Sequence, residues 1–208
     1  MNCDPIARWY RWLEYIGFGR ALERRRVAFL QDVKDAQRAL VLGDGDGRFL
    51  VRLVDQNLRQ HPGWAIDYVD VSGRMLELAR ARAGEQGVTY HQADALTMPL
   101  PEGEYDLIVT HFFLDCFDER DAQALVEKVA RSARSDARWL ISEFRETSWW
   151  SRWMLRGLYL FFRITTGLET RRLVDHWPLL KREGFRLQKQ EPGVFGSVSS
   201  ELWVRGLF

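Results

Sequence analysis

The most constraining feature of the chain is an apolar run that leads directly into three alternating glycines. The run is residues 39–42, Ala-Leu-Val-Leu. Gly43, Gly45 and Gly47 follow, with one residue between each pair. Apolar residues then resume at helical spacing, so the segment predicts a buried strand, a tight turn and a helix. Such a turn directs backbone N–H groups into a crevice, where they can hold the polar part of a nucleotide-like ligand. The same pattern also occurs in ordinary connections between a strand and a helix.

The glycine spacing separates this turn from two other nucleotide-binding loops. Dinucleotide-binding units carry G-x-G-x-x-G, which requires a glycine where this chain has Arg48. Phosphate-binding P-loops end in Gly-Lys-Ser or Gly-Lys-Thr, and no such triplet follows here. The spacing therefore disfavours a nicotinamide cofactor and excludes a P-loop.

Composition bears on the class of partner and on the compartment. The 208 residues include 30 Lys and Arg against 29 Asp and Glu, so we predict no nucleic-acid partner. Hydrophobic residues make up 46% of the chain, enough for the core of one domain. Cys3 and Cys116 lack the spacing of a metal site or a disulfide framework, and we predict no metal. The first residues lack the apolar core of a secretory signal, so we expect a cytoplasmic protein.

Strand and helix patterns alternate along the chain. We predict strands at 39–42, 64–69, 88–93, 105–112, 139–144, 185–191 and 201–205. We predict helices at 6–16, 21–33 and 49–58, a helix capped by Ser72, and a helix with apolar positions from 122 to 133. This order predicts an α/β fold with a doubly wound parallel sheet and helices on both faces. Ligands of such sheets bind beyond the carboxyl ends of the strands.

Two acidic residues follow neighbouring strands at that edge. Asp70 ends the second predicted strand, where a carboxylate can accept hydrogen bonds from both hydroxyls of a ribose. Asp94 follows the third strand, where it can accept from an exocyclic amine such as that of adenine. The alternatives are a helix N-terminal charge for Asp70 and a solvated loop carboxylate for Asp94. The ordered set of glycine turn and two acids favours an adenosine site.

With this ordered set the chain resembles the class I S-adenosylmethionine-dependent methyltransferases. Residues 40–47 resemble the first motif of that family, residues 69–72 with 75–76 the second, and residues 92–96 the third. Residues 105–109 resemble its fourth strand, and the final hairpin resembles its last two strands. The resemblance implies a Rossmann-like, mostly parallel seven-stranded sheet. It also implies S-adenosylmethionine as cofactor and S-adenosylhomocysteine as product.

The family pattern assigns cofactor contacts to particular residues. The implied cofactor-binding residues are Gly43, Asp44, Gly45, Gly47, Asp70, Val71, Asp94, Ala95 and His111. The chain departs from the pattern at Val41, where the family carries an acid two residues before the first glycine. We predict that Asp44 replaces this acid and pairs with the ammonium of the cofactor. Asp44 lies too early in the turn to cap the next helix, whereas Asp46 is expected to cap it.

Three residues at the predicted rim are candidates for catalysis. They are His111 and Glu143, which end strands, and His176, which lies in the segment expected to close over the cleft. The implied reaction is an in-line displacement, in which a hydroxyl or amine acceptor attacks the methyl carbon after losing a proton. The alternative for His111 is a packed residue that lines the cofactor without chemistry.

An aromatic-rich segment before the final hairpin is the expected acceptor region. The candidate substrate-binding residues are Tyr10, Phe112, Asp115, Trp149, Trp153 and His176. Residues 149–168 also carry arginines at positions 152, 156 and 163, which form a basic stripe if the segment is helical. Such a helix can roof an apolar pocket or touch an anionic membrane peripherally. The alternative is plain packing of a cap helix with solvated arginines.

These features predict one methyltransferase domain over residues 1–208. Its expected parts are N-terminal helices at 1–36, a cofactor-binding core at 37–145, a helical cap or insertion at 146–182 and a C-terminal hairpin at 183–208. The predicted function is S-adenosylmethionine-dependent methyl transfer to a small apolar or aromatic acceptor. The alternatives are a catalytically silent protein of the same fold that binds a cofactor or a partner, and a nicotinamide-dependent oxidoreductase.

Overall fold

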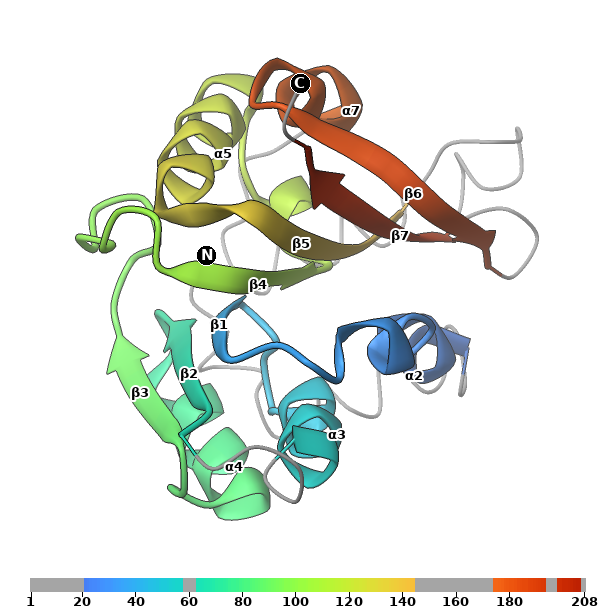
Figure 1. Ribbon diagram of the computed structural model, residues 1–208. Coiled ribbons are helices and arrows are strands. Elements are labelled where there is room, and N and C mark those ends of the chain that lie inside the picture. Colours follow the sequence, from blue (N-terminus) through green and yellow to red (C-terminus); the bar gives the residue numbers. More distant parts are fainter. Residues whose placement is uncertain (1–20, 58–62, 145–173, 194–197, 207–208) are drawn as a thin grey trace.

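Seven strands form one sheet in the order β3-β2-β1-β4-β5-β7-β6 (Figure 1). The computed structural model describes residues 21–57, 63–144, 174–193 and 198–206. Strands β1 to β5 pair in parallel, and β7 runs antiparallel to both of its neighbours. The predicted doubly wound, mostly parallel seven-stranded sheet is confirmed.

The elements follow the predicted order closely. The strands are β1 (Arg38–Leu42), β2 (Ala65–Asp70), β3 (Val88–Gln92), β4 (Tyr105–His111), β5 (Ala133–Phe144), β6 (Phe185–Pro192) and β7 (Val198–Arg205). The helices are α2 (Ala21–Arg26), α3 (Arg48–Asn57), α4 (Gly73–Ala83), α5 (Glu119–Ser132) and α7 (His176–Arg182), with short 3₁₀ helices η2 (Leu30–Val33) and η3 (Leu114–Cys116). The predicted cap of α4 is confirmed, because Ser72 Oγ accepts a hydrogen bond from the Met75 amide at 3.1 Å.

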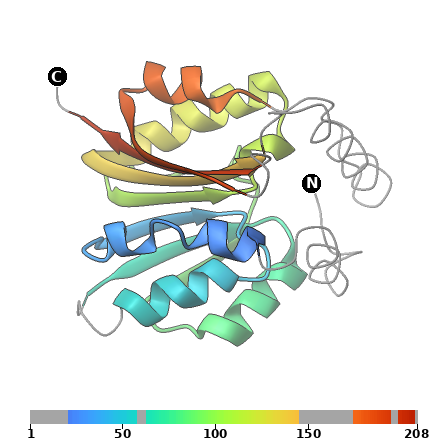
Figure 2. The same ribbon diagram turned by 90° about the vertical axis from the view of Figure 1, so that its right-hand side faces the viewer.

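Two layers of helices cover the sheet. The view in Figure 2 shows α5 and α7 on one side of the strands and α2, α3 and α4 on the other. Alternate residues of β1 serve the two layers: Ala39 and Val41 pack with α3, and Leu40 and Leu42 pack with α5. All four are buried, as expected for a central strand covered on both faces. None of the helices in the described ranges has the length and apolar character needed to cross a membrane.

The predicted helix at 21–33 is wrong in its extent. Helix α2 ends at Arg26, and the 3₁₀ helix η2 begins only at Leu30. The Arg25 carbonyl accepts from the Ala28 amide at 3.3 Å and also from the hydroxyls of Ser142 in β5 and Ser200 in β7, at 3.2 and 2.8 Å. These contacts join the end of α2 to the sheet.

Strand β5 begins six residues earlier than predicted, at Ala133 instead of Trp139. Its first part carries three exposed residues in succession, at positions 134–136, and therefore lacks the alternation that indicates a strand. Pairing with β4 holds this part in place, with a shift of register between Tyr105 and Leu107.

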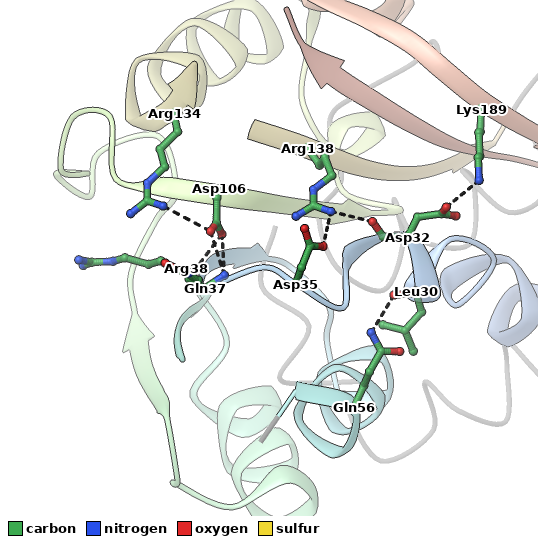
Figure 3. A network of polar contacts seen from close by, with 10 residues as sticks. All are labelled: Leu30, Asp32, Asp35, Gln37, Arg38, Gln56, Asp106, Arg134, Arg138 and Lys189. Carbon is green, nitrogen blue, oxygen red and sulfur yellow. Dashed lines mark hydrogen bonds and ion pairs between the residues drawn. The ribbon is translucent and has the colours of Figure 1, made fainter. Parts of the chain in front are cut away.

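A polar network at the amino edge of the sheet fixes the start of β1 (Figure 3). The Asp106 carboxylate accepts hydrogen bonds from the backbone amides of Gln37 and Arg38, both at 2.9 Å. It also pairs with Arg134 at 3.5 Å. Because Asp106 is only 9% exposed, these bonds form largely away from water.

The same edge holds the segment that precedes β1. The Arg138 guanidinium donates to the Asp32 carbonyl at 2.7 Å and to the Asp35 carboxylate at 2.6 Å. Lys189 of β6 pairs with the Asp32 carboxylate at 2.6 Å. Strands β5 and β6 therefore both anchor the entry into β1, at the edge opposite to the expected ligand site.

We expect Asp106→Ala to lower the free energy of unfolding by about 2–4 kcal/mol, because two backbone N–H groups would lose their buried acceptor. Asp106→Asn keeps one acceptor oxygen and should cost less. Urea denaturation measures both, with exposed Asp136→Ala as the matched control. Equal stability of Asp106→Ala and Asp136→Ala would contradict the importance of this network.

Candidate active site

The turn between β1 and α3 needs glycine for two close approaches. Gly43, Gly45 and Gly47 all have positive φ, at 65°, 66° and 77°. A Cβ on Gly47 would lie 2.7 Å from the Cα of Ala79, so α4 could not approach the turn. A Cβ on Gly43 would overlap the ring of Phe113. The turn is thus enclosed by α4 and by the loop after β4.

Tyr68 holds the middle of this turn. Its hydroxyl, from β2, donates to the Gly45 carbonyl at 2.8 Å, and its side chain is fully buried. Burial raises the pKa of Tyr68 well above the usual value, and the nearby carboxylates of Asp44, Asp70 and Asp46 raise it further. The residue therefore stays a neutral donor. No sequence motif indicates this role of Tyr68, although strand alternation places the residue on the face that meets α3.

The acid that caps helix α3 is Asp44 and not the predicted Asp46. Asp44 is 5% exposed, and its Oδ2 accepts from the Leu50 amide at 3.0 Å, in the first turn of α3. The prediction that Asp44 lies too early to cap the helix is wrong, because the left-handed glycines fold the chain back. Asp46 binds arginine instead: it accepts from Arg48 Nε at 3.0 Å and pairs with Arg82 of α4 at 2.9 Å.

Asp70 and Asp94 follow adjacent parallel strands at the same edge. Asp70 Oδ1 accepts from the Ser72 amide at 2.8 Å, and Asp94 Oδ1 accepts from the Leu96 amide at 2.9 Å. The Ala93 amide donates to the Asp70 carbonyl at 3.1 Å, which joins the two strand ends. Both carboxylates are thus oriented by their own turns.

Val71 lies directly after Asp70 and is unusual in its exposure. Of the large hydrophobic side chains that the structure describes, it alone is exposed, at 41%. Ala95, which follows Asp94, is buried at 8%. A flat apolar ring with polar edges binds to a surface of this kind. The apolar side chain packs against the ring, and the two oriented carboxylates accept hydrogen bonds from its edges.

The turn after β4 is held by Glu143 at the end of β5. Glu143 Oε1 accepts from the Phe113 amide at 3.0 Å and from the Leu114 amide at 2.8 Å. Its side chain is 3% exposed, and Oε2 has no hydrogen-bond partner within the part of the chain that the structure describes. Burial raises the pKa of Glu143 well above the usual value, and the negative charge of Asp115 raises it further.

His111 ends β4 and is buried, with 3% exposure. Its ring meets that of Phe49 edge-on at 4.7 Å, and neither ring nitrogen has a hydrogen-bond partner among residues 21–57, 63–144, 174–193 and 198–206. Burial, with a smaller effect of Arg26, lowers the pKa of His111 to about 3. A base works best when its pKa lies near the working pH, so this buried imidazole is a weak base.

His176 belongs to a buried cluster between α7 and β7. Its Nε2 lies 2.9 Å from Glu201 Oε2, and Glu201 also accepts from the indole N–H groups of Trp177 and Trp203. Burial opposes the ionisation of Glu201, but these hydrogen bonds, first that of His176, outweigh it and lower the pKa of Glu201. The contacts bind α7 to the sheet, and they engage the His176 nitrogen internally.

The remaining predicted substrate residues fall into two groups. Phe112 directly follows β4, and Asp115 lies in η3, close enough to Glu143 to influence its charge. Tyr10, Trp149 and Trp153 lie outside the described residues, as do the predicted helix at 6–16 and nearly all of the aromatic segment. No group of three or more His, Cys, Asp and Glu side chains in the described ranges is arranged to hold a metal ion.

The sequence of the core matches a known domain family. Residues 39–136 match a family model described as a methyltransferase domain. A demethylmenaquinone methyltransferase from Thermus thermophilus is 33% identical over 100 residues, which are 47% of this chain and 44% of that protein. The chain thus matches less than half the length of this curated relative.

Solved methyltransferases share the fold. Magnesium protoporphyrin IX methyltransferase from Synechocystis, with S-adenosylhomocysteine bound, has a TM-score of 0.63 and 18% identity over 92% of this chain and 84% of its own. The N-methyltransferase NodS from Bradyrhizobium japonicum, with the same ligand, has a TM-score of 0.65 and 14% identity over 88% of this chain and 87% of its own. The chain thus has the fold of solved methyltransferases, and its residues 39–136 match a methyltransferase domain.

Protonation of His111 should make stability depend on pH. Its pKa rises from about 3 in the folded protein to about 6.5 on unfolding, so the unfolded chain binds more protons between these values. We expect the free energy of unfolding to fall as the pH drops from 6.5 to about 4, more steeply in the wild type than in His111→Phe. The difference in slope should reach up to about 1.4 kcal/mol per pH unit. Parallel slopes in urea titrations would contradict a buried neutral His111.

Proposed function

We propose that the protein transfers a methyl group from S-adenosylmethionine to a small apolar or aromatic acceptor. The observation that carries this proposal is the convergence of the glycine turn, Asp70 and Asp94 at the carboxyl edge of the sheet. The named acceptors of two related proteins, demethylmenaquinone and magnesium protoporphyrin IX, are small molecules and support the choice of acceptor class.

The residues present fit the cofactor. Asp70 suits the ribose hydroxyls, Asp94 the adenine amine, and the exposed side chain of Val71 one face of the adenine ring. A Cβ placed on Gly45 would meet no atom within 4 Å, so the backbone of the turn is open to a ligand there. When bound, S-adenosylmethionine supplies a methyl group on a positively charged sulfur.

The charge of the site also suits this cofactor, which carries a sulfonium and an ammonium. Asp44, Asp46 and Asp70 all lie close enough to Tyr68 to raise its pKa, so three carboxylates gather around the turn. Asp46 pairs with Arg48 and Arg82, and we propose that Asp44, which is buried in the turn, contacts the cationic part of the cofactor.

The chain contributes alignment and exclusion of water rather than a strong base. With S-adenosylmethionine bound, an acceptor aligned with the methyl–sulfur bond would take the methyl group, release S-adenosylhomocysteine and lose its proton to solvent, so the residues present would mainly orient it. Phe112 and Asp115, on the turn after β4, are the described residues proposed to meet the acceptor. His111 is proposed to line the cofactor, since its lowered pKa makes it a poor proton acceptor.

We expect Asp70→Ala to weaken the binding of S-adenosylhomocysteine by about 1.5–3 kcal/mol, roughly tenfold or more. The reason is the loss of the carboxylate proposed to hold both ribose hydroxyls. Isothermal calorimetry measures the affinity, with Asp136→Ala as the control. Wild-type affinity in Asp70→Ala would remove this assignment.

Two further results would overturn the function itself. NADH bound more tightly than S-adenosylhomocysteine would favour an oxidoreductase. Binding without methyl transfer to any member of a panel of quinones, phenols and fatty acids, followed by mass spectrometry, would favour a catalytically silent protein of this fold.

The proposed ion pair of Asp44 can be separated from its capping role. Asp44→Asn keeps an oxygen that can accept from the Leu50 amide but removes the charge. We expect Asp44→Asn to weaken the binding of S-adenosylhomocysteine by about 2–5 kcal/mol, since one partner of a desolvated charge pair is lost. Binding of adenosine, which lacks the ammonium, should change little. Equal losses for both ligands would indicate a damaged turn and contradict the ion pair.

A further inference from the structure

The carboxylate of Glu143 bridges two segments that are thirty residues apart in sequence. It lies at the end of β5, and one of its oxygens accepts from two successive amides, those of Phe113 and Leu114. The bridge is buried, since Glu143 and Leu114 are 3% and 1% exposed. Two backbone N–H groups therefore depend on one side chain for their acceptor.

The turn held in this way has an unfavourable backbone conformation. Phe112 has a φ of 54° and is the one non-glycine residue with positive φ in the described part of the chain. Such a conformation costs energy in a bulky residue and persists only where the surroundings enforce it. The Phe112 amide still pairs with the Ser142 carbonyl at 2.7 Å, so the reversal begins directly after the last sheet bond.

The reversal sends two aromatic rings in different directions. Phe113 lies against Gly43, so closely that a Cβ on Gly43 would overlap its ring. Phe112 packs against Phe144 at 5.0 Å between ring centres and carries the Arg26 guanidinium over its ring at 5.1 Å. The conformation of this turn therefore determines the position of the Phe113 ring beside Gly43.

We propose that Glu143 is a positioning residue that fixes Phe113 as a wall of the cofactor site, beside the methionine part of S-adenosylmethionine. This inference rests on the proposed function, which supplies the ligand. Glu143 acts through the two amides of the turn and not on the reacting atoms. Its role therefore requires an acceptor oxygen and no negative charge.

The choice of variants follows from this distinction. Burial favours the neutral form of Glu143 by raising its pKa, and Gln reproduces a neutral side chain with one acceptor oxygen. Glu143→Leu fills a similar volume without any acceptor. Glu102→Ala, at an exposed position between β3 and β4, is the control for loss of a glutamate.

The test is calorimetry with S-adenosylhomocysteine and with adenosine. We expect Glu143→Leu to lower the affinity for S-adenosylhomocysteine about tenfold or more. The affinity of Glu143→Leu for adenosine should fall much less. The affinities of Glu143→Gln and Glu102→Ala for both ligands should stay within about twofold of the wild-type values. In the Phe113→Ala background, Glu143→Leu should have little further effect, because the residue acts through that ring.

Several results would overturn the inference. Wild-type affinity in Glu143→Leu, or losses that add fully to those of Phe113→Ala, would show that the carboxylate does not act through the ring. Weak binding in Glu143→Gln would assign the role to the charge. If Glu143→Leu does not fold, the Phe113→Ala variant alone provides the test. Unchanged affinity of Phe113→Ala for S-adenosylhomocysteine would show that the Phe113 ring is not a wall of the cofactor site. A wild-type protein that binds no S-adenosylhomocysteine would instead contradict the proposed function.

Discussion

The left-handed glycines between β1 and α3 are the constraint on which the rest of the site depends. They reverse the chain so tightly that the side chain of Asp44 reaches the amide of Leu50 and caps the helix. Gly47 lets α4 approach to the backbone of the turn, and Gly43 leaves room for Phe113. The helix start, the packing of its neighbour and the shape of the ligand site are thus consequences of one backbone conformation.

Burial then sets the charge states around this turn. Removal from water shifts the pKa of Glu143 and Tyr68 upward and that of His111 downward, in each case favouring the neutral form. The carboxylates of Asp46 and Glu201 are engaged by internal partners. The histidine near this turn is therefore neutral, and the buried carboxylate of Asp44 lies within the turn itself.

The sequence predicted those parts of the structure that depend on local pattern. The apolar run at 39–42, the glycine turn, the acids after β2 and β3 and the Ser72 cap all follow from neighbouring residues. The parts it did not predict depend on residues far away in the chain. At the end of helix α2, serines of β5 and β7 donate to the Arg25 carbonyl. Arg82 of α4 takes the carboxylate that was expected to cap α3.

The contacts of the candidate catalytic residues also depend on distant parts of the chain. The sequence places His111, Glu143 and His176 near the rim but does not show what each side chain contacts. The structure shows that Glu143 holds the turn after β4 and that His176 binds Glu201. Both contacts join elements that are separated by at least twenty residues of chain, and no local pattern indicates them.

We propose that S-adenosylmethionine binds at the carboxyl edge of β1, β2 and β3. A crystal structure of the protein with S-adenosylhomocysteine tests it most directly. We predict the adenosine between Asp70 and Asp94, against Val71, with the methionine part on the turn from Gly43 to Gly47. Ligand density at another edge of the sheet, or an adenosine that contacts neither carboxylate, would contradict this claim.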